Sequence, residues 1–266
     1  MQGKGDIQKK YTDMLDREVE INFPPKRIIS LVPSQTELLY DLGLEEEVVG
    51  ITKFCVHPEN WFRNKRRVGG TKTVHIDIVK ELQPDLIIAN KEENTREQIE
   101  ELAAMYPLWI SNIQTIDEGL QMIRDVGKMV SKTDRAEQLA TEIEAGFALL
   151  RRAQDDRKRV AYFIWRKPWM CAGGDTFISN MITTMGWENV LADKQRYPEI
   201  ELEELQDKEI DMVLLSSEPY PFKEAHIAEI KTVLPGADVR LVDGEMFSWY
   251  GSRMKLAAGY LQSIKY

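Results

Sequence analysis

Short apolar runs alternate with amphipathic stretches along most of the chain, beginning near residue 24. A run of three to seven mostly apolar residues is typical of a strand that is buried on both faces of a sheet. Apolar residues that recur every three or four positions are typical of a helix with one buried face. The strands predicted in this way cover residues 27–32, 48–52, 86–89, 108–110, 159–165, 211–215 and 239–242. The helices predicted between them cover residues 35–43, 76–82, 95–105, 177–185 and 253–264.

The alternation of strands and helices indicates βαβ units around mostly parallel sheets. It is interrupted by a mainly helical stretch, in which a helix over 134–154 would be about 30 Å long at 1.5 Å per residue. Because the alternation starts afresh after this helix, we predict an α/β protein with two Rossmann-like βα lobes joined by one long helix. The alternative is a single domain covered by that helix. The predicted parts are an extension at 1–23, a lobe at 24–116, a helical segment at 117–155 and a second lobe at 156–266.

Local signals place several helix ends. Ser34, followed three residues later by Glu37, has the spacing of a capping box, and Asp134 with Glu137 has the same spacing. Gly43 is expected to end the first of these helices. Residues up to about 20 are mostly polar, and we expect them to be frayed.

Composition limits the classes of function. The chain has 266 residues, of which 43% are hydrophobic and 30% charged, which is ordinary for a globular protein. Its net charge of −9 and sequence pI of about 5.1 indicate no affinity for nucleic acid or an anionic membrane. The two cysteines, Cys55 and Cys171, are predicted to be free thiols. The first residues lack the apolar segment of a signal peptide, so an export signal was removed or the protein is cytoplasmic.

Catalytic motifs are missing from the sequence. No GxSxG, Walker A or GxGxxG pattern occurs. The three histidines, His57, His75 and His226, lie far apart and lack the spacing of metal ligands. The adjacent carboxylates Glu92 and Glu93 follow a predicted strand, but adjacency alone does not make an acid/base pair. We therefore predict a protein that is not an enzyme and carries no resident cofactor or metal.

Aromatic residues gather just after predicted strands, where open α/β sheets bind ligands. Aromatic rings at such an edge supply rigid contact area, although packing between loops is the alternative. The candidate ligand-binding residues are Phe54, Trp61, Trp165, Trp169, Tyr220, Trp249, Tyr250 and Arg253.

Three segments carry a resemblance to a known family. The run Arg27–Leu39, followed by Leu42-Gly43 and Val48-Val49-Gly50, resembles the N-terminal signature of class III substrate-binding proteins, the helical-backbone metal receptors. Leu82–Ile87 is similar to the second motif of that family, and Ser248-Trp249-Tyr250 resembles its C-terminal region. The likeness extends over about residues 24–264 and is greatest to the cobalamin-binding branch.

The resemblance implies a role in an ABC importer. It implies a ligand held in a cleft between two lobes, an extracytoplasmic or periplasmic location and a monomer that docks on a permease dimer. The docking acids implied are Asp77 in the first lobe and Glu203 in the second. Family members often carry Glu at the first of these positions, so the shorter Asp77 is a departure.

Three kinds of ligand or activity stay open at this point. A corrinoid is broad and partly apolar, which suits aromatic walls. A ferric siderophore or haem would favour cationic side chains or an axial histidine, for which the chain offers His57, His75 and the set Lys53, Lys72, Arg166, Lys167 and Arg253. A cytoplasmic enzyme or metallochaperone on the same scaffold is the alternative from another class.

Overall fold

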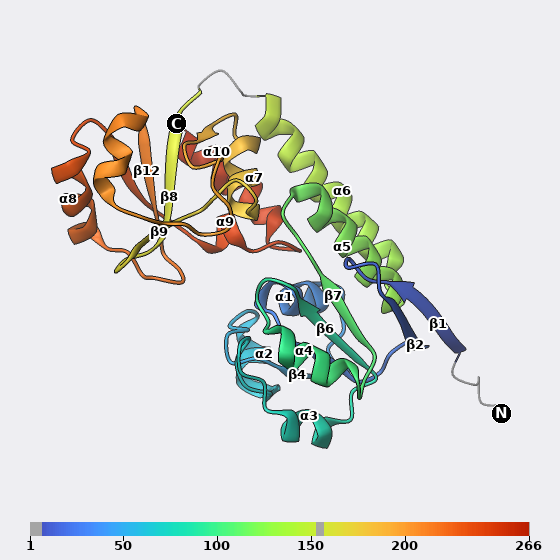
Figure 1. The fold of residues 1–266 in the computed structure, drawn as a ribbon. Coiled ribbons are helices and arrows are strands. Elements are labelled where there is room, and N and C mark those ends of the chain that lie inside the picture. The colour runs from blue at the N-terminus through green and yellow to red at the C-terminus, as the bar shows by residue number, and fades with distance from the viewer. Residues whose placement is uncertain (1–6, 153–156, 266) are drawn as a thin grey trace. The chain divides into compact units, whose positions relative to one another are not determined.

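The computed structural model describes residues 7–152 and 157–265, and it divides them into two compact units. The first unit comprises residues up to 113 together with 118–141 and 250–253. The second comprises 114–117, 142–249 and the residues from 254 onward. Each unit contains one main twisted sheet with helices packed on it, and the first unit adds a two-stranded hairpin, which confirms the predicted two-lobed α/β fold (Figure 1).

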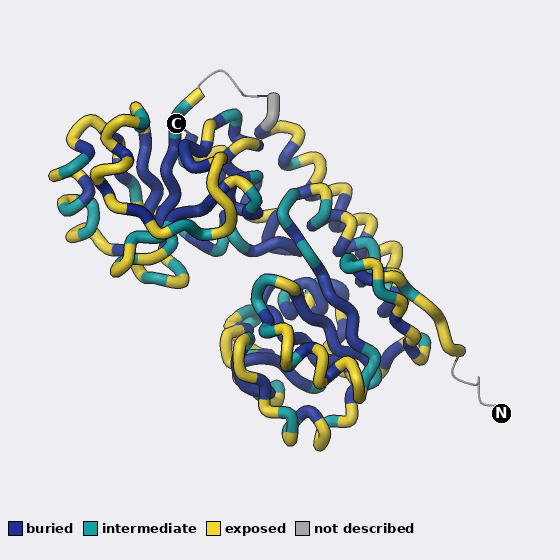
Figure 2. Tube along the Cα trace, viewed as in Figure 1, coloured by how far each residue is buried: buried dark blue, intermediate teal, exposed yellow. Residues whose placement is uncertain are grey.

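The sheet of the first unit has five parallel strands in the order β5-β4-β3-β6-β7. The strands lie where unbroken apolar runs predicted them, apart from the two-residue β5, and they are mostly buried (Figure 2). Their bounds are β3 Ile28–Ser30, β4 Val48–Ile51, β5 Arg66–Arg67, β6 Leu86–Asn90 and β7 Leu108–Ser111. The helices that follow them are α1 Pro33–Asp41, α2 Glu59–Asn64, α3 Ile76–Leu82, α4 Arg96–Ala103 and α5 Ile116–Met129.

The sheet of the second unit is mixed. Strands β8, β12 and β13 are parallel neighbours, β10 pairs with β8, and β9 and β11 add an antiparallel edge. Their bounds are β8 Arg159–Trp165, β9 Trp169–Cys171, β10 Glu188–Asn189, β11 Glu199–Ile200, β12 Met212–Ser216 and β13 Asp238–Val242. The helices are α7 Phe177–Thr184, a 3₁₀ helix at Leu202–Lys208, α8 Glu224–Val233, α9 Glu245–Ser248 and α10 Met254–Lys265.

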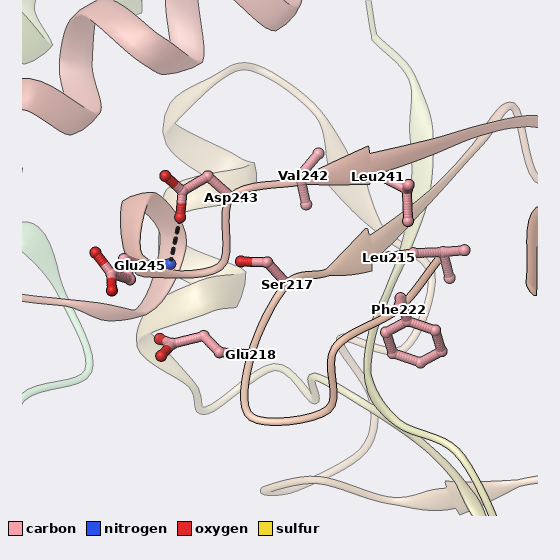
Figure 3. A pocket seen from close by; sticks show the side chains of 8 residues that line it. All are labelled: Leu215, Ser217, Glu218, Phe222, Leu241, Val242, Asp243 and Glu245. Carbon is pink, nitrogen blue, oxygen red and sulfur yellow. Dashed lines mark hydrogen bonds between the residues drawn. The ribbon is translucent and has the colours of Figure 1, made fainter. Parts of the chain in front are cut away.

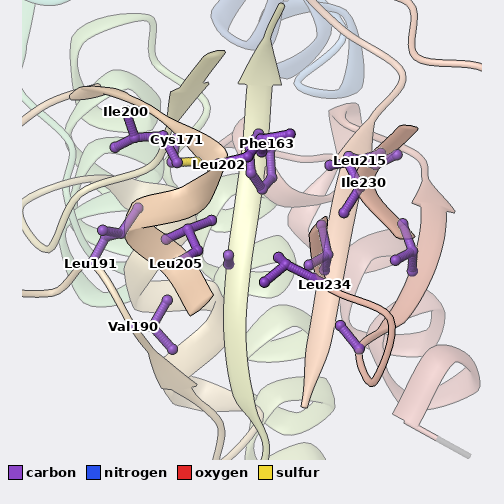
Figure 4. Packing of buried hydrophobic residues seen from close by; sticks show 14 of the residues in the cluster. Phe163, Cys171, Val190, Leu191, Ile200, Leu202, Leu205, Leu215, Ile230 and Leu234 are labelled. Carbon is purple, nitrogen blue, oxygen red and sulfur yellow. The ribbon is translucent and has the colours of Figure 1, made fainter. Parts of the chain in front are cut away.

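One face of this second sheet carries a continuous apolar core (Figure 4). Phe163 and Leu215 from the central strands meet Leu205 of the 3₁₀ helix and Ile230 of α8. All four side chains are almost fully buried. This packing keeps the sheet rigid and holds the loops at its carboxyl edge in place.

The long helix is α6, Thr133–Arg152. Residues 133–141 belong to the first unit and 142–152 to the second, so the helix contributes to both, as the pattern predicted. The predicted end of this helix near residue 154 lies outside the described residues.

The N-terminal residues differ from the prediction. Residues 7–23 are not frayed but form an antiparallel hairpin of β1 Ile7–Thr12 and β2 Glu18–Phe23. Val19 and Ile21 of β2 are buried, and the indole of Trp109 donates to the carbonyl of Thr12 at 3.2 Å. The hairpin is therefore part of the first unit.

The two predicted capping boxes are also wrong. Helix α1 begins at Pro33 with no side-chain cap, and Glu37 instead accepts two hydrogen bonds from Arg253, at 2.8 and 2.6 Å. Glu137 likewise pairs with Arg124, at 2.9 and 3.1 Å. Gly43, with φ of 76°, does follow the end of α1 as predicted, and Gly186, with φ of 82°, follows the end of α7 in the same way.

The Arg253–Glu37 pair gives a test of how residues 250–253 are held in the first unit. Both side chains are largely buried, at 8% and 15% exposure. Arg253→Ala leaves a buried carboxylate unpaired, and we expect it to lower the free energy of unfolding by about 3 to 5 kcal/mol in urea denaturation. Lys10→Ala, which removes an exposed pair with Glu18, is the control and should cost less than about 1 kcal/mol. If Arg253→Ala lowered the free energy of unfolding no more than this control does, the pair would not be what holds residues 250–253 in the first unit.

Candidate functional site

The carboxyl edge of the second sheet carries a cluster of five aromatic side chains, called here the aromatic cluster: Trp165, Trp169, Tyr220, Phe222 and His226. The Tyr220 ring lies edge-on to Trp165, with centroids 5.6 Å apart, and also edge-on to Phe222 at 4.8 Å. The rings of Trp169 and Phe222 are stacked within 4° of parallel, at 6.1 Å. The sequence predicted Trp165, Trp169 and Tyr220 as ligand-binding residues, and the structure brings these three together.

Trp165 and Trp169 enter the cluster from a hairpin rather than from one loop. Trp165 ends β8, and Trp169 begins β9, a strand that the apolar pattern did not predict. Trp165 is 39% exposed, whereas Trp169 packs against the apolar core. Trp165 is therefore the member of this pair whose ring is open to a ligand.

Arg166, beside the cluster, and His226, within it, both have partners of their own. Arg166 donates to both carboxylate oxygens of Glu229, at 2.8 and 2.9 Å, and its guanidinium lies 5.6 Å from the centre of the Trp169 ring. The Nδ1 atom of His226 accepts from the backbone amide of Lys223 at 2.8 Å, and its Nε2 atom lies 3.3 Å from the Tyr220 hydroxyl. The contact with His226 orients Tyr220. Because Arg166 and His226 are both engaged by these partners, neither is free to bind an anion.

A pocket of about 600 Å³ opens beside the cluster at the carboxyl ends of β12 and β13 (Figure 3). Its apolar lining comes from Leu215, Phe222, Leu241 and Val242, and its polar lining from Ser217, Glu218, Asp243 and Glu245. Phe222 belongs to both the pocket and the aromatic cluster, so the two form one surface. The three carboxyl groups make this surface suited to hydrogen-bond donors and unsuited to anions.

Glu218 organises the rim of this pocket. One of its carboxylate oxygens accepts from the Ser248 hydroxyl at 2.8 Å and from the Trp249 indole at 2.9 Å. Burial raises the pKa of Glu218, and the nearby carboxylates of Glu245 and Asp243 raise it further. The sequence analysis missed Glu218, although the polar run Ser216-Ser217-Glu218 directly after a predicted strand was a usable signal.

Four other predicted ligand-binding residues have structural partners. Trp61 is fully buried in α2, where its indole donates to Glu45 at 2.6 Å, so its ring offers no surface to a ligand. Trp249 is 7% exposed and braced by Glu218. Tyr250 is 5% exposed, its hydroxyl donates to Glu93 at 3.0 Å, and burial raises its pKa well above the ordinary value. Arg253 is paired with Glu37. We leave these four out of the proposed contact surface.

The first unit presents a polar edge with one exposed ring. Asn90, the last residue of β6, donates to the Ser111 hydroxyl at 2.9 Å and accepts from the backbone amides of Glu92 and Glu93 at 2.8 and 3.0 Å. Phe54, in the loop after β4, is 50% exposed, and the Lys53 ammonium lies 5.1 Å from its ring centre. Phe54 is therefore the predicted residue of this unit that is accessible.

The remaining candidates lie on separate surfaces. Asp77 is exposed in the first turn of α3, and Glu203 is exposed in the first turn of the 3₁₀ helix.

Both cysteines are free and buried, and burial raises the pKa of Cys55 to about 11. Within residues 7–152 and 157–265, no three His, Cys, Asp or Glu side chains come together as a possible metal site. Over the same residues, no helix is both long and apolar enough to cross a membrane.

Comparisons with known proteins agree with this fold. A family model described as periplasmic binding protein matches residues 28–234. The vitamin B12-binding protein of Vibrio campbellii is 26% identical over 218 residues, which cover 80% of this chain and 78% of that protein. Two solved structures share the fold. The periplasmic vitamin B12-binding protein BtuF of Vibrio cholerae has a TM-score of 0.79 at 21% identity, covering 91% of this chain and 97% of the other. The periplasmic haem-binding protein RhuT of Roseiflexus sp. RS-1 has a TM-score of 0.77 at 22% identity, covering 90% and 96%.

The raised pKa of Glu218 predicts a pH-dependent contribution to stability. A carboxyl group with a raised pKa in the folded state stabilises the fold fully below its ordinary value of 4.5, and this contribution is lost as pH rises through the raised value. Glu218→Gln keeps an acceptor oxygen and cannot ionise, so its melting temperature should rise relative to the wild type between pH 4 and pH 8. Glu203→Gln, at an exposed site, controls for the general change in charge. The change in melting temperature caused by Glu218→Gln is corrected by subtracting the change caused by Glu203→Gln. If the corrected value were the same at pH 4 and at pH 8, the prediction would be wrong.

Proposed function

Because the chain belongs to the periplasmic binding protein family, we propose that it is the substrate-binding component of an ABC importer and that its ligand is a corrinoid. It is a binding protein and not an enzyme. The observation that carries the ligand assignment is the exposed Trp165 ring of the aromatic cluster, beside a pocket whose charged groups are all carboxyls.

The chemistry of this surface favours a corrinoid over the other ligands considered. A corrin ring is flat and partly apolar, and its edge carries neutral amides that donate hydrogen bonds. The Trp165 ring suits the flat face, and the carboxyl groups of Glu218, Asp243 and Glu245 suit the amides. Haem propionates or an anionic ferric chelate would meet like charges there, and the nearby Arg166 is already paired with Glu229.

The name of the relative from Vibrio campbellii supports the same assignment. Phe54 of the first unit remains a predicted contact, since its ring is exposed at the carboxyl edge of that sheet. The location outside the cytoplasm is also part of the proposal and is supported by the periplasmic relatives.

Titration with cyanocobalamin tests the proposed ligand. We expect saturable one-to-one binding in calorimetry, with a matching change in tryptophan fluorescence. Trp165→Ala should weaken binding about tenfold or more, since a tenfold loss corresponds to about 1.4 kcal/mol and an aromatic contact is commonly worth at least that much. Trp165→Phe should retain most of the affinity.

Leu256→Ala is the matched control, because Leu256 is 57% exposed on α10 of the same unit and lies outside the site. Absence of binding up to about 100 μM, which corresponds to less than roughly 5.5 kcal/mol, would refute the corrinoid assignment. Haem and ferric siderophores would then be titrated in the same way.

Docking on a permease is proposed to use Asp77 and Glu203. Both are exposed carboxylates in the first turn of a helix, where they are free to meet basic side chains of a partner. Asp77→Lys and Glu203→Lys should leave ligand affinity unchanged and lower the stimulation of ATP hydrolysis by the reconstituted transporter at least about tenfold. Glu97→Lys on α4 and Glu224→Lys on α8 reverse equally exposed first-turn acids and serve as controls. Equal losses in the control variants would show that the docking assignment is wrong.

A further inference from the structure

A second pocket lies in the first unit, away from the residues assigned to ligand binding. It has a volume of about 720 Å³ and is called here the basic pocket. Its lining residues are Lys9, Tyr11, Phe23, Lys128, Ser131, Lys132, Thr133, Asp134 and Arg135. These come from the N-terminal hairpin, the end of α5 and the start of α6, which lie together in the structure (Figure 1).

The hairpin is fastened to the helices at this place. The Tyr11 hydroxyl donates to the backbone carbonyl of Lys128, 117 residues further along the chain, at 3.3 Å. All the lining residues belong to the same compact unit. The pocket is therefore formed by a hairpin that folds back onto the helical segment, and not by a single loop.

The lining carries four cationic side chains and one carboxylate. Lys128 is partly neutralised by Asp125, at 3.1 Å, and Asp134 is the opposing charge within the lining. Within the part of the chain that the structure describes, Lys9 and Lys132 have no carboxylate within ion-pair distance. A local excess of positive charge in a protein of net charge −9 points to a ligand that supplies the missing anion.

Two of the cations are held in position by their own contacts. The Lys9 ammonium lies 3.3 Å from the centre of the Phe23 ring, so its position is fixed without an anion. The Arg135 guanidinium donates to the backbone carbonyl of Asp41 at 3.2 Å and to the side chain of Gln138 at 3.4 Å. Both contacts use neutral partners, which leaves the positive charges available to an anion.

We propose that the basic pocket binds an organic phosphate ester. Lysine ammonium groups bind phosphate as point charges. The volume exceeds what one phosphate group needs and falls in the range of small-molecule sites. The rings of Tyr11 and Phe23 offer contact area to the organic part.

Titration with glycerol phosphate, followed by amide resonances in NMR, tests this site. At constant ionic strength, maintained with chloride, we expect saturable shifts for residues 128–135 and a dissociation constant on the order of 1 mM. The double variant Lys9→Gln/Lys132→Gln should weaken binding at least about tenfold, since it removes the two cations that lack a carboxylate partner.

Lys10→Gln is the matched control. Lys10 is the next residue of the same strand, its side chain points to the opposite face, and it pairs with Glu18 at 2.7 Å. We expect it to bind glycerol phosphate as the wild type does. An equal loss in Lys10→Gln, or no saturable shift up to about 50 mM ligand, would overturn the proposal.

Vesicles distinguish a soluble ester from a lipid headgroup. Wild-type protein and Lys9→Gln/Lys132→Gln are sedimented with phosphatidylcholine vesicles that contain phosphatidylglycerol or lack it. Retention of the wild type alone on the anionic vesicles would assign the phosphate to a lipid, and binding of glycerol phosphate without vesicle retention would assign it to a soluble ester. Cyanocobalamin binding uses neither lysine, so the two proposals fail or stand separately.

Discussion

The buried ion pair between Arg253 and Glu37 joins residues 216 positions apart within the first unit. It holds a four-residue segment from the C-terminal half of the chain against α1. Gly251, at φ of 91°, sits so close to α1 that a Cβ there would lie 3.1 Å from the carbonyl oxygen of Ser34. The second unit in turn takes residues 114–117 from the N-terminal half, where Asn180 accepts from the backbone amide of Ile116 at 2.9 Å. Neither unit is therefore a continuous stretch of sequence.

The same ion pair shows why local sequence signals failed at helix ends. A capping interaction on an exposed helix is worth about 1 kcal/mol, whereas a buried guanidinium without its carboxylate costs about 3 to 5 kcal/mol. Glu37 therefore satisfies the distant Arg253 and not the amides of its own helix. Glu137 repeats the pattern on a smaller scale by pairing with Arg124. Thr176, which has no such competing partner in the described structure, does cap α7 by accepting from the Ser179 amide.

The parts of the fold that could be predicted are those governed by burial on two faces. Strands such as β6 and β12 each begin with four consecutive apolar residues because both faces of a parallel sheet are covered. The N-terminal hairpin was missed because β1 is mostly exposed, although the alternation of Val19 and Ile21 with polar residues in β2 was a usable signal. Aromatic residue type predicted a candidate region for the site but not the direction of each ring. Trp165 is open, whereas Trp249 is buried against a carboxyl group that only the tertiary structure brings near.

Net charge was the least informative quantity for the binding surfaces. The value of −9 predicts repulsion of anions by the molecule as a whole, and the acidic pocket beside Phe222 follows that expectation. The basic pocket does not, because charges are screened beyond about 8 Å at physiological ionic strength. Lys9 and Lys132 therefore determine the potential within their own pocket almost independently of the excess acids elsewhere. Two pockets of opposite sign can coexist in one acidic chain, because the potential in each is set by the charged groups within a few ångströms.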